Sequence, residues 1–98
     1  MLVSVGSAGN VGEALGEPDG GLAAWIKANP PGAAWGAETE RAGVLAFDPD
    51  GKNRSLFATG IRNCVGLAIQ PGSGTPWCST NERDGLGDDL VPDYVTRV

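Results

Sequence analysis

The sequence predicts an all-β fold with one short helix and a loop rich in glycine and proline. The chain has 98 residues, 16 of them glycine and 7 proline, and its apolar residues come in short runs. Short apolar runs between glycines and prolines are typical of strands joined by turns rather than of helices. Strands that recur at roughly 8–12-residue intervals further indicate a sandwich, a barrel or a propeller sheet. A chain of this length forms at most one small domain.

Residues 1–41 are predicted to contain one strand and then a long loop. Leu2–Val5 is a short apolar strand candidate, and the following segment, Ser7–Gly21, is polar and rich in glycine. Leu22–Asn29 has apolar residues three and four positions apart, which is the spacing of one or two helical turns. Two prolines follow it, and a residue before proline is biased away from helical conformation. The segment Gly32–Glu40 is expected to be loop again.

Residues 42–98 are predicted to contain the remaining strands and an acidic loop. The expected strands are Gly43–Phe47, Ser55–Thr59, Val65–Ile69 and Pro76–Thr80, with a further one beginning within Leu90–Val98. The sequence Asp48-Pro-Asp-Gly51 predicts a hairpin turn, because proline presets φ and glycine accepts positive φ. Pro76 denies its strand one ladder hydrogen bond. The strand pattern by itself leaves a sandwich, a barrel and a propeller open, and the shared apolar-x-Pro-x-Gly pattern at Phe47–Gly51 and after Ile69 is a hint of propeller hairpins.

Charge and hydropathy exclude two classes of partner. The net charge is -5, and nothing clusters the 7 lysines and arginines, so we expect no nucleic acid partner. No apolar run approaches the roughly 20 residues of a membrane span, and we expect neither a membrane span nor a leader peptide. The sequence has no histidine, which removes the commonest general base and metal ligand.

The two cysteines, Cys64 and Cys78, are too few to define a disulfide framework. Both lie in apolar runs that resemble strands, so we expect two buried free thiols. A bridge would require Cα atoms within about 7 Å, a distance that the sequence does not provide. The two cysteines therefore do not indicate whether the protein resides in an oxidising or a reducing compartment.

Three glycines after the first strand, Gly6, Gly9 and Gly12, resemble a variant phosphate loop of a dinucleotide-binding βαβ unit. Such a unit needs a helix of about ten residues and then a parallel strand. Further glycines and a proline within Gly16–Gly21 interrupt that helix. An NAD-binding fragment is therefore the least favoured function, and a plain glycine-rich loop is preferred.

The most informative residues are the pair Arg62-Asn63 and the acidic loop Glu82–Asp89. Arginine offers a rigid fork of donors, and asparagine offers both a donor and an acceptor. An acidic loop bent by glycines provides the oxygen ligands that Ca²⁺ prefers. Two simpler interpretations stay open: that Arg62 pairs with a nearby carboxylate while Asn63 satisfies a turn, and that the loop is merely solvated. The ordered ending Leu90–Tyr94 favours a loop that is held in place.

Together these residues resemble the soluble pyrroloquinoline-quinone (PQQ)-dependent sugar dehydrogenases, most closely the sorbosone dehydrogenase branch. Three blocks carry the resemblance: Leu2–Ser7 with Asn10–Glu13; Arg41–Arg54; and Gly60–Asn63 with Val65–Ala68 and Asn81–Tyr94. The third block is the most specific, because its order and spacing extend over about 35 residues. This sequence departs from the family at Cys64, where proline is usual, and at Pro76, where an apolar residue is usual.

The resemblance implies a six-bladed β-propeller that binds PQQ and Ca²⁺ and oxidises a sugar or sugar aldehyde at C1 by hydride transfer to the quinone. Arg62 and Asn63 would contact PQQ. Asp84 and Gly85 would offer backbone oxygens to Ca²⁺, with Asp89 behind them. The family's catalytic histidine is expected upstream of Met1, so no catalytic residue is assigned within the chain.

Members of that family are several times longer, so the resemblance implies that residues 1–98 are an internal fragment of one propeller domain, a partial β-propeller of about one to two four-stranded antiparallel blades. The fragment is expected to have little activity alone and to self-associate through open strand edges. The resemblance also implies a sugar substrate, an electron acceptor and a periplasmic or secreted location for the full-length enzyme. The alternative is a propeller that serves as a non-catalytic binding module.

Overall fold

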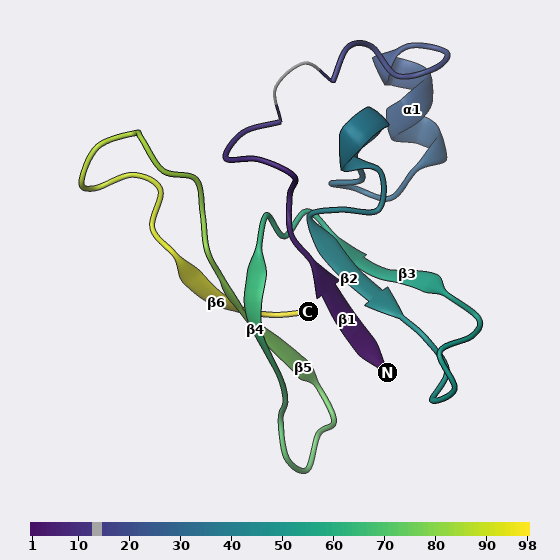
Figure 1. Ribbon diagram of the computed structural model, residues 1–98, viewed down its shortest axis with the longest axis vertical. Helices are drawn as coiled ribbons and strands as arrows, with labels where there is room; N and C mark the ends of the chain where they lie inside the picture. The colour runs from purple at the N-terminus through teal and green to yellow at the C-terminus, as the bar shows by residue number, and fades with distance from the viewer. Residues whose placement is uncertain (13–14) are drawn as a thin grey trace.

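The strands form two antiparallel sheets of three strands each in the computed structural model, which describes residues 1–12 and 15–98 (Figure 1). The first sheet has the order β1-β2-β3, comprising Leu2–Val5, Gly43–Ala46 and Ser55–Thr59. The second has the order β4-β5-β6, comprising Cys64–Ile69, Pro76–Thr80 and Tyr94–Arg97. The predicted all-β class is confirmed. Each sheet has three strands, whereas four per blade were predicted.

The strand bounds follow the sequence pattern closely. β1, β3 and β5 begin and end at the predicted residues, β2 ends one residue earlier, and β4 begins one residue earlier at Cys64. The predicted hairpin between β2 and β3 is closed by the amide of Asp48, which donates to the carbonyl of Lys52 at 2.9 Å. Short-range turn chemistry was therefore sufficient to place this hairpin.

Pro76 is accommodated because it is the first residue of β5. Proline is tolerated at that position of a strand, where its missing N–H interrupts the ladder least. Its carbonyl oxygen still accepts a hydrogen bond from the amide of Val98 at 3.0 Å. The departure from the family pattern at this position thus leaves the sheet intact.

The long connection between β1 and β2 contains the helix α1 (Leu22–Ala28) and a short 3-10 helix, η1 (Gly36–Glu38). The helix was predicted and η1 was not. The helix has no buried residue. Trp25 of the helix packs edge to face against Trp35 just before η1, with ring centroids 5.8 Å apart, so two parts of the connection contact each other. The segment Ser7–Gly21 is loop as predicted, apart from residues 13 and 14, which lie outside the described residues and include Glu13 of the resemblance block.

Figure 1 shows the two sheets side by side, with the segment after β1 and the loop between β5 and β6 leaving them at the same end. At the join, the amide of Ser7 donates to the carbonyl of Arg62 at 2.8 Å. β1 thereby meets the entrance to β4, although about 60 residues separate them in the chain. No parallel strand pair occurs among the described strands, so they do not form the βαβ unit that a dinucleotide loop requires.

The core between the sheets is small and contains a disulfide. Its buried apolar members are Val44, Ile61, Cys64 and Cys78. The prediction of two free thiols was wrong: Cys64 and Cys78 are bonded, with Cα atoms 5.7 Å apart. The two strands that contain them are neighbours, and this pairing brings the cysteines within bridging distance. That proximity depends on the β4–β5 register, which composition alone does not reveal.

Candidate functional site

Arg62 joins two loops that are far apart in the sequence. Its guanidinium donates to the backbone carbonyls of Asn81 at 3.1 Å and Glu82 at 2.9 Å. On the other side, Nε donates to the backbone carbonyl of Asn10 at 3.1 Å. Nη2 donates to the side-chain oxygen of Asn10 at 3.1 Å and to the carbonyl of Gly9 at 3.5 Å. An arginine has five N–H donors, so this one uses all of its hydrogen-bonding capacity within the protein.

Asn10 extends the same connection to the acidic loop. Its Oδ1 accepts from the amide of Asp84 at 2.7 Å, and its Nδ2 donates to the carbonyl of Asp84 at 3.0 Å. The side-chain amide therefore pairs with both backbone groups of one residue, as a neighbouring strand would. The position of Asp84 is consequently set by a residue 74 positions away along the chain.

Asp93 closes the base of the acidic loop. Its carboxylate accepts from the amide of Glu82 at 2.9 Å and from the side chain of Asn81 at 3.3 Å. These two hydrogen bonds and the charge of Arg62 lower the pKa of Asp93 below its ordinary value, although desolvation opposes the change. The prediction that the ending Leu90–Tyr94 is held in place is confirmed at this residue.

Asn63 lies beside Gly6 at the end of β1. A Cβ atom at Gly6 would come within 2.5 Å of the Asn63 Oδ1, so only glycine leaves room for this side chain. The backbone carbonyl of Asn63 accepts from the amide of Asn81 at 2.9 Å. Within residues 1–12 and 15–98, the Asn63 side chain makes no hydrogen bond, which leaves its amide available.

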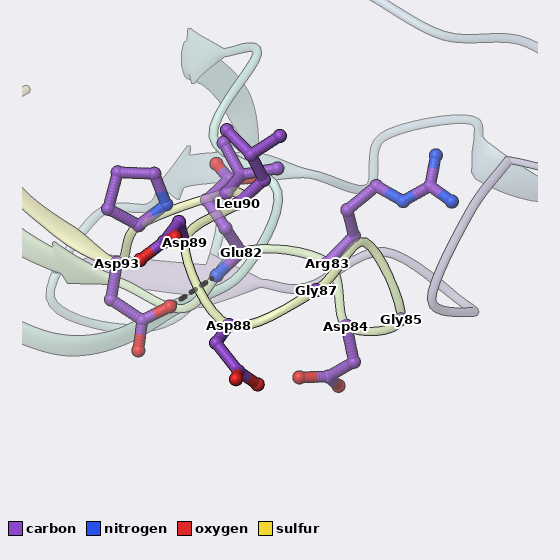
Figure 2. A pocket seen from close by; sticks show the side chains of 11 residues that line it. Glu82, Arg83, Asp84, Gly85, Gly87, Asp88, Asp89, Leu90 and Asp93 are labelled. Carbon is purple, nitrogen blue, oxygen red and sulfur yellow. Dashed lines mark hydrogen bonds between the residues drawn. The ribbon is translucent and has the colours of Figure 1, made fainter.

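The tip of the acidic loop borders a cavity of about 390 Å³ that is lined by residues between Glu82 and Asp93. Figure 2 shows the side chains of Asp84 and Asp88 extending to one side of the loop and that of Arg83 extending to the other. Glycines at 85 and 87 have positive φ and bend the tip. The side chains of Asp84, Asp88 and Asp89 are exposed.

No group of three or more His, Cys, Asp or Glu side chains is placed to hold a metal ion within the part of the chain that the structure describes. A Ca²⁺ site here would therefore depend on backbone carbonyls, as was predicted for Asp84 and Gly85. The Asp84 carbonyl already accepts one hydrogen bond from Asn10, and a carbonyl oxygen has a second lone pair. The calcium assignments to Asp84, Gly85 and Asp89 stay predictions.

A second cavity, of about 340 Å³, lies between the segment after β1 and the base of the acidic loop. Its charged lining residues are Glu38, Arg62, Glu82 and Arg83. Glu38 is buried, and its Oε1 accepts from the hydroxyl of Ser7 at 3.0 Å and the amide of Ala8 at 2.8 Å. This carboxylate therefore fixes the start of the glycine-rich segment.

The structure thus joins Arg62 to the base of the acidic loop and, through Asn10, to Asp84, and it leaves Asp89 exposed at the tip. The simpler interpretation that Arg62 pairs with a carboxylate is wrong, because its hydrogen-bond acceptors are carbonyl and amide oxygens. Sequence reasoning did not single out Asn10, Glu38, Arg83 or Asp93. Asn10, Arg83 and Asp93 lie inside the blocks of the resemblance, which was the available signal.

Comparison with known proteins adds no functional description. No family model matches the chain, and no solved structure matches it significantly. The chain is similar to an uncharacterized protein of Borreliella burgdorferi, with 36% identity over 52 residues that make up 53% of this chain. The match spans 14% of that protein's length. Among the described residues, no helix has the length and apolar character to cross a membrane.

Proposed function

We propose that this chain is part of a PQQ-dependent sugar dehydrogenase, and that its two sheets belong to neighbouring blades of a β-propeller. The proposal rests on one observation: the sequence blocks that resemble that family lie next to one another in the structure. Residues 6–10, the pair Arg62-Asn63 and the loop after Asn81 lie at one end of the sheets and are joined by hydrogen bonds. Residues that serve one site are expected to converge in this way, whereas unrelated loops need not.

The chemistry of the available donors fits an anionic, carbonyl-rich cofactor. Nε of Arg83 is buried without a hydrogen-bond partner, and the side-chain amide of Asn63 is unpaired among the described residues. The adjacent cavity of about 340 Å³ falls within the range of small-molecule sites. When bound, PQQ supplies the quinone that accepts a hydride. The chain's own contribution is to bind and orient it, with Arg62 holding the surrounding loops and Asn63 offering a donor and an acceptor.

The disulfide supports the proposed periplasmic or secreted location. Disulfides persist in oxidising compartments and are rare in the cytosol of most organisms. The Cys64–Cys78 bond is buried, and it joins β4, which follows Asn63, to β5, which precedes the acidic loop. The Cys64–Cys78 disulfide would therefore persist in an extracytoplasmic compartment.

Open strand edges support the proposed self-association of the isolated chain. Leu56 and Phe57 on β3 and Val95 on β6 are exposed apolar side chains on strands that end a sheet. Unpaired edges with exposed apolar residues favour pairing with another chain. Sedimentation velocity across a range of concentrations is expected to show dimers or larger species, and a monomer at every concentration would contradict this part of the proposal.

A non-catalytic binding module is the second candidate, and one observation favours it. Arg62, the residue that the resemblance places on the cofactor, donates all of its hydrogen bonds to the protein. An arginine used in this way stabilises a loop arrangement whether or not a cofactor binds. The two candidates differ in one measurable property, which is the affinity of the chain for PQQ.

Calorimetric titration of the chain with PQQ, in buffer with Ca²⁺ and in buffer with EDTA, separates the candidates. The dehydrogenase proposal predicts saturable binding that Ca²⁺ strengthens. Titration with NAD⁺ serves as the control and is expected to give no binding. Absence of saturable PQQ binding in both buffers would overturn the proposal and favour the binding module.

A further inference from the structure

The two arginines around the second cavity differ, because Arg62 is fully hydrogen-bonded whereas the Arg83 side chain has no partner among the described residues. Its Nε is buried, yet it makes no hydrogen bond to residues 1–12 or 15–98, and the guanidinium forms no ion pair with them. A buried donor left unsatisfied costs about 1–3 kcal/mol, and more if it is charged. Native proteins rarely leave such a group without a function or a bound molecule.

The side chain of Arg83 lies at a cavity of the size that small-molecule sites have. The side chain extends away from the carboxylates of Asp84 and Asp88 (Figure 2), and it lines the cavity of about 340 Å³ together with Val11, Gly12 and Ala42. The cavity therefore combines an apolar wall with a forked cation. Guanidinium groups bind carboxylates through two parallel hydrogen bonds, and an apolar wall suits an aromatic ring.

The two carboxylates that line this cavity are positioned differently from Arg83. The Glu38 carboxylate accepts hydrogen bonds from Ser7 and Ala8 through Oε1, whereas the Glu82 carboxylate makes no hydrogen bond with the described residues, and only the backbone of Glu82 is bonded. Neither carboxylate neutralises Arg83 by a direct ion pair. Arg62 is also present in the lining, but its donors are already used. The open donors of the cavity therefore belong to Arg83.

We infer that Arg83 binds a carboxylate of an aromatic anion in this cavity, and that Arg62 is a positioning residue for the loops around it. The inference rests on the proposed function in one respect, because PQQ would be the aromatic carboxylate concerned. The principal anion contact in this inference is Arg83, whereas the sequence had singled out Arg62.

The test uses the full 98-residue chain and calorimetric titration with two probes, PQQ and isophthalate, a simple aromatic dicarboxylate. The variants are Arg83→Gln, which removes the charge, and Arg83→Lys, which keeps the charge without the fork. Arg97→Gln on the exposed surface of β6 is the matched control, since it also removes one positive charge. Thermal unfolding of each variant is measured alongside.

Arg83→Gln is expected to weaken PQQ binding about 10- to 100-fold, the loss that follows from one charged hydrogen-bonding partner. Arg83→Lys is expected to weaken it less, and Arg97→Gln is expected to leave it unchanged. Neither Arg83 variant should lower the unfolding temperature, because the side chain makes no hydrogen bond or ion pair with residues 1–12 and 15–98. A merely structural role would lower that temperature without a selective loss of binding.

The outcomes distinguish this inference from the proposed function. If PQQ binds equally to the chain and to Arg83→Gln, the inference is overturned and the dehydrogenase proposal stands. If PQQ does not bind but isophthalate binds and depends on Arg83, the dehydrogenase proposal fails and the carboxylate site stands. If neither probe binds, both are overturned.

Discussion

The base and the tip of the loop between β5 and β6 are held in different ways. The base, defined here as Asn81, Glu82 and Asp93, is fixed by hydrogen bonds from Arg62 and by those that Asp93 accepts. The tip, Gly85–Leu90, is exposed throughout. The acidic residues that are conspicuous in the sequence lie mainly at the tip, whereas the base is held by Arg62 and Asp93, whose partners are mostly backbone groups. A charged motif therefore marks where a site lies without identifying the groups that build it.

The largest expected effect comes from removing the disulfide between β4 and β5, the strand that leads into the base. The double substitution Cys64→Ala with Cys78→Ala is expected to lower the free energy of unfolding by about 3 kcal/mol, the value for a bridge closing a loop of about 15 residues. Urea unfolding with and without reductant measures it. Reductant should destabilise the native chain and leave the double variant unaffected. Equal stability of the oxidised and reduced chain would show that the bridge adds nothing to the base.

The next effect is expected from Arg62. Arg62→Gln removes most of the hydrogen bonds that join the base to Asn10, and we expect a loss of about 2–3 kcal/mol in the free energy of unfolding. Urea unfolding is again the measurement, with Arg97→Gln as the control expected to stay within about 0.5 kcal/mol. Equal stabilities of the two variants would contradict the role of Arg62 in holding the loops.

A smaller effect is expected from protonation of Asp93. Because its pKa is lowered in the folded state, its contribution to stability is present above its ordinary pKa of about 3.9 and is lost as the pH falls through the lower folded value. NMR titration of the Asp93 carboxyl group and of the Glu82 amide should show both signals changing together below that ordinary pKa. In Asp93→Asn the Glu82 amide should lose this pH dependence. A carboxyl pKa at or above the ordinary value would refute the assignment.

The smallest effect is expected at the tip. Asp88→Asn is expected to change the free energy of unfolding by no more than about 0.5 kcal/mol, because the side chain is exposed and makes no hydrogen bond among the described residues. Urea unfolding at neutral pH, beside Asp93→Asn, gives the comparison. A loss at Asp88 as large as that at Asp93 would remove the distinction between base and tip.

Much of the fold could be predicted because its signals are local. The hairpin at Asp48–Gly51, the strand bounds of β3 and β5, and the helix within Leu22–Asn29 depend on turn residues and apolar spacing that lie within a few positions of each other. The two errors at the level of the sheet, the number of strands per sheet and the state of the cysteines, both concern pairing between segments. Pairing is a property of register, which a single sequence does not display.

The sequence singled out only some of the residues that build the candidate site, and the assignments of PQQ and Ca²⁺ to that site stay predictions. Arg62 and the acidic loop were singled out because charged residues are easy to recognise in a sequence. Asn10 was missed because a single asparagine in a glycine-rich segment has no distinguishing pattern, although it pairs with Asp84 across 74 positions. Arg83 was included within an acidic motif and was not considered separately, since its lack of a partner is visible only once the side chain is packed.

The sequence by itself determined the all-β class, the position of the turns, and the location of a polar site after the strands that precede Arg62 and Glu82. These follow from local backbone preferences and from the alternation of short apolar runs with glycine and proline. The tertiary structure alone decided that Cys64 and Cys78 are bonded, that Arg62 is fully occupied and that Arg83 is not. The physical reason is that bonding and hydrogen-bond satisfaction depend on distances between segments, and folding sets those distances.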